Sequence, residues 1–304
     1  MEQGRHRYFA FGLTLASDLR LPEFTEALHI GDAEVDIRAG AVPSSGAEIG
    51  ARIGPFVCAT KNMLWLRVPG VARFLVRDGR EITYAVEATA DESSLRVFML
   101  GSCIGALLLQ RGQLVLHGNA FEVADGCVIC VGTSGAGKST LAARMLQRGH
   151  RILADDVCPI DMEARAVPGL PRLKLWQDAA RRLKIGTDGL RRIRPSLDKF
   201  DVPLDGMYCD EPLPIRAIYL LRPWNEPRLL SEPVIGLAKY PALRANSYRF
   251  RFLKGMGEEP RHLAQCSRLA ARVPIARVHR PKSGFDVDGL ADLILEDLAC
   301  RPAS

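Results

Sequence analysis

The sequence predicts an α/β fold in which a domain built around a glycine-rich loop follows a smaller, β-rich domain. Three observations lead to this prediction. An apolar strand, a glycine-rich loop and a helix follow one another at 127–147, two adjacent aspartates close a second apolar strand at 152–154, and residues 1–92 contain short strands separated by turns. We therefore expect a β-rich N-terminal domain at 1–92 and a second domain at 93–304.

Residues 1–92 carry the pattern of a sheet. A short apolar strand is expected at 8–13, and further strands at 63–68 and 72–76. Asp78 and Gly79 separate two apolar runs, as in a two-residue hairpin. This part of the sequence holds no catalytic constellation, so it either recognises or positions a partner or covers the core of the second domain.

The run 93–110 is apolar on nearly all sides and has the length of a helix, which is typical of a buried helix. It contains Gly101 and Gly105, the spacing seen in packed membrane helices, but Arg96 and Arg111 bound too short an apolar stretch for a membrane span. We expect this helix to join the two domains and to pack beneath the sheet of the second.

A glycine-rich loop then fits the phosphate-loop (Walker A) pattern. Its glycines let backbone N–H groups surround a polyphosphate, the lysine reaches the β- and γ-phosphates, and the serine hydroxyl holds Mg²⁺. The loop lies between an apolar strand at 127–131 and a helix at 141–147, which Gly149 ends as a C′ residue. The predicted ATP-binding residues are Gly132, Thr133, Ser134, Gly135, Ala136, Gly137, Lys138, Ser139 and Thr140.

Two carboxylates follow the loop. Asp155 and Asp156 come 17 and 18 residues after Lys138, at the end of the strand at 152–154, where a parallel strand faces the ligand crevice of an α/β sheet. One carboxylate can complete a Mg²⁺ shell while the other accepts the proton of an attacking hydroxyl. His117, which follows an apolar strand at 114–116, can approach the same crevice.

The rest of the chain alternates between predicted strands and helices. Strands are expected at 157–160, 215–221 and 275–278, and helices at 176–185, 233–243, 262–271 and 290–298. The segment 186–203 reads as a charged loop. Its cations either form a solvated surface, or one of them, Lys199 or an arginine, reaches a transferring phosphoryl group.

The composition is that of a globular protein of about two domains, with 304 residues, 47% hydrophobic and 25% charged. The net charge of +6 does not indicate nucleic acid, because aromatic residues make up only 7% and are not interleaved with basic runs. The positive excess lies at 172–199, and we call this stretch the cationic wall. Positive charge beside a phosphate site attracts an anionic ligand.

No run reaches the apolar length of a membrane span, and the first residues lack the apolar region of a signal peptide, so a cytoplasmic protein without membrane contact is expected. Eight cysteines lie mostly within apolar runs. Cys127 and Cys130 point to opposite faces of a strand and have no partner pair at metal-ligand spacing. We therefore expect reduced thiols with a structural role.

Three segments resemble the catalytic core of the HPr kinase/phosphorylase family: Leu-His-Gly at 116–118, the glycine-rich loop, and Arg-Gly-His-Arg-Ile-Leu-Ala-Asp-Asp at 148–156. The resemblance implies a P-loop kinase core related to the nucleotide-binding fold of phosphoenolpyruvate carboxykinase, with ATP and Mg²⁺ as cofactors. It implies that Lys138 and Ser139 bind nucleotide phosphate and metal and that His117 lies beside the active centre. It gives the aspartates the roles of metal ligand, which we assign to Asp155, and of base, which we assign to Asp156.

The sequence differs from that of HPr kinases in one segment, and this difference limits which members of the family it resembles. HPr kinases carry, after the aspartate pair, a glutamate in a Glu-Val-Arg-Gly-Leu-Gly-like segment that is tied to metal binding and to the reverse, dephosphorylating reaction. The comparable stretch here, at 168–176, reads Pro-Gly-Leu-Pro-Arg-Leu-Lys-Leu-Trp and has no such glutamate. In this respect the chain resembles divergent HPr kinase-like proteins, some of which phosphorylate the C-terminal serine of a lasso-peptide precursor.

The hypothesis at this point is an ATP-dependent kinase that phosphorylates a serine or threonine hydroxyl on a peptide or small protein. Three alternatives stay open: an HPr-type serine kinase in carbon regulation, a small-molecule kinase, and an ATP-binding sensor that transfers no phosphate. The aspartate pair argues against the sensor, because a pure binder needs no base. The acceptor and the oligomeric state, including a homo-oligomer, are not fixed by the sequence.

Overall fold

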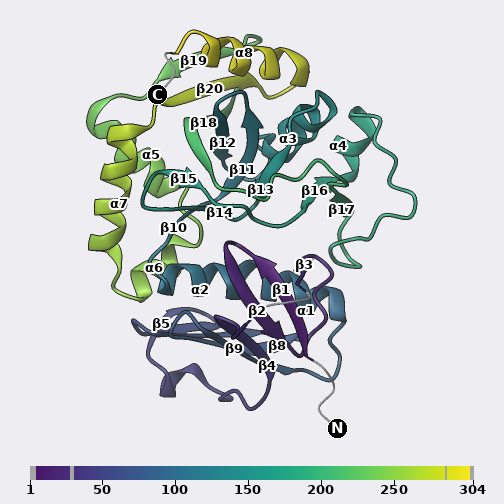
Figure 1. Ribbon diagram of the computed structural model, residues 1–304, viewed down its shortest axis with the longest axis vertical. Coiled ribbons are helices and arrows are strands. Elements are labelled where there is room, and N and C mark those ends of the chain that lie inside the picture. Colours follow the sequence, from purple (N-terminus) through teal and green to yellow (C-terminus); the bar gives the residue numbers. More distant parts are fainter. Residues whose placement is uncertain (1–4, 28–30, 285, 302–304) are drawn as a thin grey trace. The chain divides into compact units, whose positions relative to one another are not determined.

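The computed structural model describes residues 5–27, 31–284 and 286–301 (Figure 1), so the N-terminal residues 1–4, on which part of the signal-peptide expectation rests, lie outside the described residues. The chain forms two compact units. Unit 1 comprises Met1–Val115, Ile193–Pro195 and Tyr248–Leu263, and unit 2 comprises Leu116–Arg192, Ser196–Ser247 and Ala264–Ser304. The domain boundary after residue 92 stays a prediction, and the two units divide the chain elsewhere.

Unit 1 is built on a nine-stranded sheet with the order β3-β1-β2-β4-β9-β8-β7-β6-β5. The strands are β1 (His6–Ala10), β2 (Leu13–Ser17), β3 (Thr25–Glu26), β4 (Val35–Ala39), β5 (Ala51–Gly54), β6 (Val57–Ala59), β7 (Met63–Val68), β8 (Ala72–Arg77) and β9 (Glu81–Val86). The predicted hairpin is confirmed, because β8 pairs antiparallel with β9, but its connection has three residues and not two. Arg77 pairs with Glu81, and of the residues between them Asp78 and Gly79 have positive φ. The predicted strand at 8–13 is two strands, β1 and β2, because Phe11 and Gly12 form a turn.

The apolar run of unit 1 is helical, as predicted, and consists of α1 (Glu92–Phe98), a π-helical turn, η2 (Met99–Cys103), and α2 (Ile104–Gln110). Among the described residues, Glu92–Gln110 is the one helical run with the length and apolarity of a membrane span, but 78% of that window is buried, as in a core helix. The run contacts β8, and the Gln110 side chain accepts a hydrogen bond from the Gly79 N–H at 2.9 Å. The run therefore packs against the sheet of unit 1, and its position beneath the sheet of the second domain stays a prediction.

Two glycines of this run make room for an aromatic ring of the same unit. A Cβ added at Gly105 would lie 2.4 Å from Tyr248 Cε1, and one added at Gly101 would lie 3.3 Å from the Tyr248 hydroxyl. Tyr248 precedes α6 (Phe250–Gly255), a helix that contacts β5 and β6. The glycine spacing that is typical of membrane helices thus serves the packing of a tyrosine on a buried helix.

Unit 2 contains a mixed sheet whose central strands determine where the functional side chains lie. The strands are β11 (Gly118–Val123), β12 (Gly126–Gly132), β13 (Ile152–Asp155), β14 (Cys158–Ile160), β15 (Arg165–Ala166), β18 (Leu213–Trp224), β19 (Leu230–Pro233) and β20 (Ile275–Pro281), with β10 (Leu114–Leu116) at the division between the units. The strand β11 pairs antiparallel with both β12 and β13, whereas β18 pairs parallel with both β12 and β20. Consequently β12 and β13 run in the same direction on either side of β11.

Helices and the hydrophobic core of unit 2 hold this sheet in place. The helices are α3 (Lys138–Gln147), α4 (Gln177–Arg182), α5 (Lys239–Ala245) after the 3-10 turn η3 (Gly236–Ala238), and α8 (Val287–Ala299), while α7 (Glu259–Arg272) crosses the division between the units. In Figure 1, α3 lies near α8, and the two helices are in contact. Buried side chains such as Phe121, Leu141 and Ile294 form one core cluster with the sheet. Burial of this apolar surface is the main stabilising contribution.

The charged segment 186–203 ends in a strand that the sequence did not reveal. β17 (Lys199–Pro203) pairs antiparallel with β16 (Arg172–Trp176), so that Trp176 lies opposite Lys199 and Lys174 lies opposite Asp201. The period-two signal was present, because Leu173 and Leu175 are buried and alternate with Lys174 and Trp176. This two-stranded ribbon matters for the site described below.

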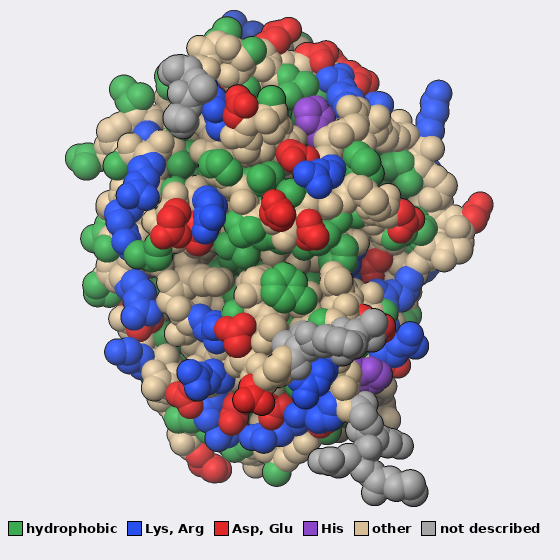
Figure 2. All heavy atoms as spheres, in the orientation of Figure 1, with side chains coloured by type: hydrophobic (Ala, Val, Ile, Leu, Met, Phe, Trp, Pro, Cys, Tyr) green, Lys and Arg blue, Asp and Glu red, His purple; other side chains and the backbone are tan. Residues whose placement is uncertain are grey.

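The state of the cysteines and the distribution of charged side chains on the surface follow from the structure. All eight thiols are free, and all except Cys300 are buried. Among the described residues no group of three or more His, Cys, Asp or Glu side chains is placed to hold a metal ion. On the face shown in Figure 2, basic side chains are interspersed with acidic ones, so the positive excess is not gathered into one patch on this face.

The packing of Tyr248 on Gly105 predicts an interaction between two substitutions. Gly105→Ala should destabilise the protein by about 1–3 kcal/mol, because its Cβ would clash with the ring. In a Tyr248→Ala background the same change should be neutral or stabilising, because alanine favours a helix over glycine by about 1 kcal/mol. Urea unfolding of the four proteins measures the coupling, and equal costs of Gly105→Ala in both backgrounds would contradict the contact.

Candidate active site

One edge of the unit 2 sheet gathers side chains from three neighbouring strands. Because β12 and β13 run in the same direction, their carboxyl ends lie at the same edge, and the antiparallel β11 begins there. The glycine-rich loop leaves this edge from β12, Asp155 closes β13, and His117 and Asn119 stand at the start of β11. Asn119 is the register partner of Asp155.

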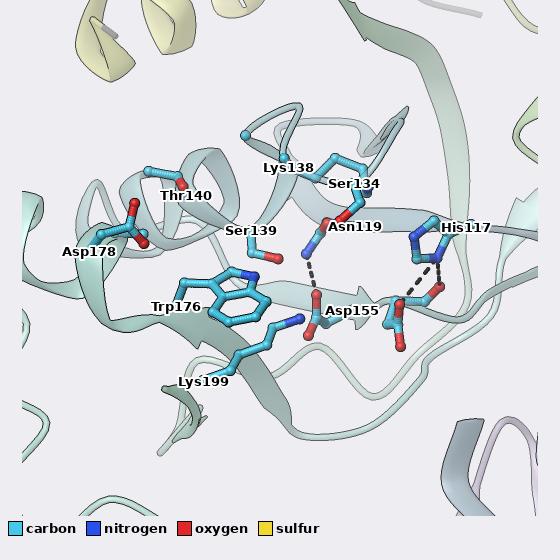
Figure 3. Close-up of a pocket in the computed structure, with 14 residues that line it drawn as sticks. His117, Asn119, Ser134, Lys138, Ser139, Thr140, Asp155, Trp176, Asp178 and Lys199 are labelled. Atoms are coloured by element: carbon cyan, nitrogen blue, oxygen red, sulfur yellow. Dashed lines mark hydrogen bonds and ion pairs between the residues drawn. The ribbon is translucent and has the colours of Figure 1, made fainter. Parts of the chain in front are cut away.

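These residues line one pocket with a volume of about 170 Å³ (Figure 3). Most of the predicted site residues share this pocket. The lining residues are His117, Asn119, Ser134, Gly135, Gly137, Lys138, Ser139, Thr140, Asp155, Asp156, Trp176, Asp178, Ala179 and Lys199. The predicted Gly132, Thr133 and Ala136 do not line it, and they contribute to the loop backbone instead.

The glycine-rich loop is held in the shape that an anion site needs. Gly137 has φ +97° and caps α3, and a Cβ at Gly132 would lie 2.7 Å from the Leu221 carbonyl oxygen. The Lys138 ammonium donates to the carbonyls of Gly132 at 2.8 Å and Thr133 at 3.2 Å, which leaves its third N–H available to a ligand. Burial lowers the pKa of Lys138, and the charges of Asp156 and Asp155 partly offset that effect.

A buried arginine that the sequence did not single out braces this loop from β20. The Arg280 guanidinium, 6% exposed, donates from Nε to the Ala136 carbonyl at 2.7 Å and from Nη2 to the Gly135 carbonyl at 2.8 Å. Two parallel bonds from one planar group fix the orientation of both peptide units. Arg280 is therefore a positioning residue for the loop.

Asp155 is buried, with 8% of its surface exposed, and both of its carboxylate oxygens accept hydrogen bonds. The Asn119 Nδ2 donates to Oδ1, and the backbone N–H of Lys174 donates to Oδ2 at 2.7 Å. Burial raises the pKa of Asp155 above its ordinary value, and the nearby charge of Lys174 offsets that rise only in part.

Asp156 reaches the same pocket through an unusual backbone. Successive side chains of a strand point to opposite faces, but Asp156 has φ +74° and the Val157 N–H donates to the Asp155 carbonyl at 2.9 Å, which makes a tight three-residue turn. This turn brings both carboxylates into one pocket. A non-glycine residue at positive φ is strained, and such strain gathers at functional sites.

Two groups hold the Asp156 carboxylate. Lys174 Nζ lies 2.9 Å from Oδ2, and His117 Nδ1 lies 3.1 Å from Oδ1 and 3.1 Å from the Asp156 carbonyl. Both neighbours of Nδ1 are acceptors, so this nitrogen carries the proton. Burial favours the neutral acid, but Lys174 and His117 outweigh it and hold the pKa of Asp156 well below its usual range.

One buried oxygen in the pocket lacks a partner. Asn119 is 1% exposed, and its Oδ1 accepts no hydrogen bond from any residue in the described part of the chain. A buried acceptor left unpaired costs about 1–3 kcal/mol, so it calls for a ligand. With the Ser139 hydroxyl and the Asp155 carboxylate it forms a set of hard oxygen donors, which is the chemistry that Mg²⁺ prefers.

The β16–β17 ribbon supplies further residues of the site. The sequence indicates Lys199 only as one of several cations and does not indicate Lys174 or Trp176. Lys174 pairs with Asp156, and Trp176 and Lys199 line the pocket directly. The expected cationic wall is smaller than its sequence suggests. Three of its six arginines form ion pairs: Arg172 and Arg191 with Asp201, and Arg192 with Asp198.

The Arg-Gly-His-Arg segment has a structural role. Gly149 has φ +90° at the C′ position of α3, as predicted, and the His150 N–H donates to the Met145 carbonyl at 3.0 Å. Arg148 pairs with Asp288 and Asp292 of α8, and Arg151 pairs with Glu122 of β11. The segment fixes α3, and hence the loop before it, against the sheet.

Part of the chain is similar in sequence to proteins of one family. Residues 110–172 match the model of the HPr Serine kinase C-terminal domain. The HPr kinase/phosphorylase of Caldanaerobacter subterraneus is 44% identical over 48 residues, which is 16% of this chain and 16% of that protein. The HPr kinase/phosphorylase of Treponema pallidum is 39% identical over 72 residues, 24% of this chain and 21% of that protein.

The similarity is local. The matched segments span less than a quarter of the length of these curated relatives. A solved structure of the Hpr(Ser) kinase/phosphatase from Coxiella burnetii is 12% identical and covers 60% of this chain and 88% of that chain, with a TM-score of 0.26 that carries no conclusion about the fold. Over residues 110–172, which include the phosphate loop and both aspartates, the chain is similar to HPr kinases.

Proposed function

We propose that the protein is an ATP-dependent kinase that transfers the γ-phosphoryl group to a serine or threonine hydroxyl of a peptide or small protein. One observation carries this proposal: the phosphate-loop residues Lys138 and Ser139 line the same pocket as Asp155, Asp156 and His117. A loop for the polyphosphate, a carboxylate for the metal and a carboxylate for the acceptor are the parts that phosphoryl transfer requires.

Mg²⁺ is the cofactor that fits this donor set. Ser139 and Asp155 would hold it, and the unpaired oxygen of Asn119 is a third protein donor beside them. When bound, the ion neutralises charge on the phosphates. Asp155 is suited to this role, because a cation would stabilise a carboxylate whose pKa is otherwise raised by burial.

Asp156 is proposed to accept the proton of the acceptor hydroxyl. It is the more exposed of the two carboxylates, with 27% of its side chain accessible, and its Oδ1 lies 3.1 Å from His117 Nδ1. As the hydroxyl oxygen forms a bond to the γ-phosphorus, the bond to the bridging oxygen breaks and its electron pair leaves with ADP, while the proton passes to Asp156. Lys138 would contact the β- and γ-phosphates.

The acceptor is the least constrained part of the proposal. The segment 168–176, which lacks the glutamate tied to the reverse reaction in HPr kinases, contributes Lys174 and Trp176 to the site. We therefore favour forward transfer to a peptide, for which a lasso-peptide precursor is one acceptor, over the HPr-type and small-molecule alternatives. A cytoplasmic location, a homo-oligomer and the absence of nucleic-acid and membrane partners stay predictions.

A second function has one observation in its favour. A base with a strongly lowered pKa has little affinity for a proton, and Asp156 is such a group. An ATP-binding sensor needs no base at all, so the lowered pKa fits it too. Phosphate transfer to any acceptor separates the two functions.

Replacing Asp156 with Asn should leave ATP binding nearly unchanged and lower phosphate transfer by at least about 100-fold, because the proton acceptor is lost. The measurement is mass spectrometry of peptides ending in serine, and of HPr in parallel, after incubation with ATP and Mg²⁺. Phosphate on the peptide and not on HPr is the expected result. Transfer by the variant at the wild-type rate would refute the base assignment, and ATP binding without phosphate on either acceptor would favour the sensor or the small-molecule kinase.

Replacing Lys174 with Met should move the acid limb of the transfer rate to higher pH by about 1–3 units. The charge of Lys174 is the largest influence that lowers the pKa of each carboxylate, so its loss raises both pKa values, and protonation then begins at a higher pH. The pH profile of kcat/KM measures the shift.

The matched control for this profile is Lys61→Met, which removes an exposed lysine of unit 1 and should leave the acid limb in place. Identical acid limbs for Lys174→Met and the wild type would mean that neither carboxylate governs the acid limb.

A further inference from the structure

Lys199 occupies a place in the pocket that the proposed mechanism does not yet use. It is the first residue of β17, it lies opposite Trp176 in the ribbon, and both side chains line the pocket. Its ammonium lies 5.6 Å from the centre of the indole ring and points toward Asp155 (Figure 3). The ring therefore orients the lysine across the pocket from the phosphate loop.

The ammonium of Lys199 has no direct counter-ion in the described part of the chain. There it forms neither an ion pair nor a hydrogen bond, and it lies over the indole ring of Trp176. Lys174, two positions before Trp176 on the neighbouring strand, differs in this respect because it is paired with Asp156. The Lys138 ammonium is likewise engaged, with two loop carbonyls.

A half-buried cation without a counter-ion is unfavourable in the free protein. Burial lowers the pKa of Lys199, and the charges of Asp155 and Asp156 offset the effect only in part. An anionic ligand in the pocket would remove this penalty. The pocket is lined on its other side by the phosphate loop, so a phosphoryl group is the anion whose chemistry fits both walls.

We propose that Lys199 is a catalytic residue that contacts a non-bridging oxygen of the γ-phosphoryl group during its transfer. This inference rests on the proposed kinase function and deepens it. As the acceptor oxygen binds phosphorus and the bond to ADP breaks, negative charge is shared among the equatorial oxygens, and a fixed cation beside them stabilises that arrangement more than the ground state. Lys138 holds the same group from the loop side.

The neighbouring arginines do not compete for this role. Arg172 and Arg191 both pair with Asp201, and Arg192 pairs with Asp198 and lies over Phe200. Arg194 belongs to unit 1, where it lies over Phe98. Of the cations that the sequence placed near a phosphoryl group at 186–203, Lys199 is the one that lines the pocket.

The test uses a probe that needs no acceptor. ADP with Mg²⁺ and aluminium fluoride imitates the planar phosphoryl group in transfer, and ADP with Mg²⁺ alone imitates the ground state. Calorimetry compares the affinities of the wild type, Lys199→Met, Lys199→Arg and the control Lys61→Met for both probes. Thermal unfolding of each variant checks that the fold is retained.

Lys199→Met should bind the aluminium fluoride complex about 100-fold more weakly than the wild type while its ADP affinity stays within about threefold. Lys199→Arg should recover part of the loss, because it restores the charge, and Lys61→Met should match the wild type. Equal binding of the fluoride complex by Lys199→Met and the wild type would overturn the inference, as would an equal loss for both probes. A wild type that binds neither probe would instead overturn the proposed kinase function.

Discussion

The site depends on the direction of three adjacent strands. β11 runs antiparallel between β12 and β13, so the end of β12, the beginning of β11 and the end of β13 meet at one edge of the sheet. Each of the three contributes a different chemistry: a loop of backbone N–H groups, an amide and an imidazole, and two carboxylates. The turn at Asp156 completes the arrangement, because without its positive φ the second carboxylate would point to the opposite face.

The pocket holds charged groups of both signs. Its lining includes the carboxylates of Asp155, Asp156 and Asp178 and the ammonium groups of Lys138 and Lys199, while Lys174 is bound directly to Asp156. The two aspartates are shifted in opposite directions, since burial raises the pKa of Asp155 while Lys174 and His117 lower that of Asp156. Environments that separate two neighbouring carboxylates in this way commonly give them separate roles, here metal binding and proton acceptance.

Local sequence patterns predicted the parts of the site that lie close together in the chain. The strand, loop, helix and Gly149 cap follow a contiguous pattern, and so does the aspartate pair at the end of β13. Asn119, Lys174 and Arg280 could not be found in the same way, and Lys199 was named only as one of several cations that could reach a phosphoryl group. Their roles depend on which strands pair, on the burial of Asn119 and on the approach of β20 to the loop, and these are long-range properties. The alternation around Leu173 was a usable signal for β16, but its charged positions resembled a surface loop.

The central claim is that this sheet edge binds the polyphosphate of ATP through the phosphate loop. Isothermal titration calorimetry of ATP with Mg²⁺ against the wild type and Lys138→Ala tests it most directly. The account predicts saturable binding of one nucleotide per chain and an affinity at least about tenfold lower for the variant, since a charge-assisted contact to phosphate is lost. Equal affinity for both proteins, or no binding by the wild type, would contradict it.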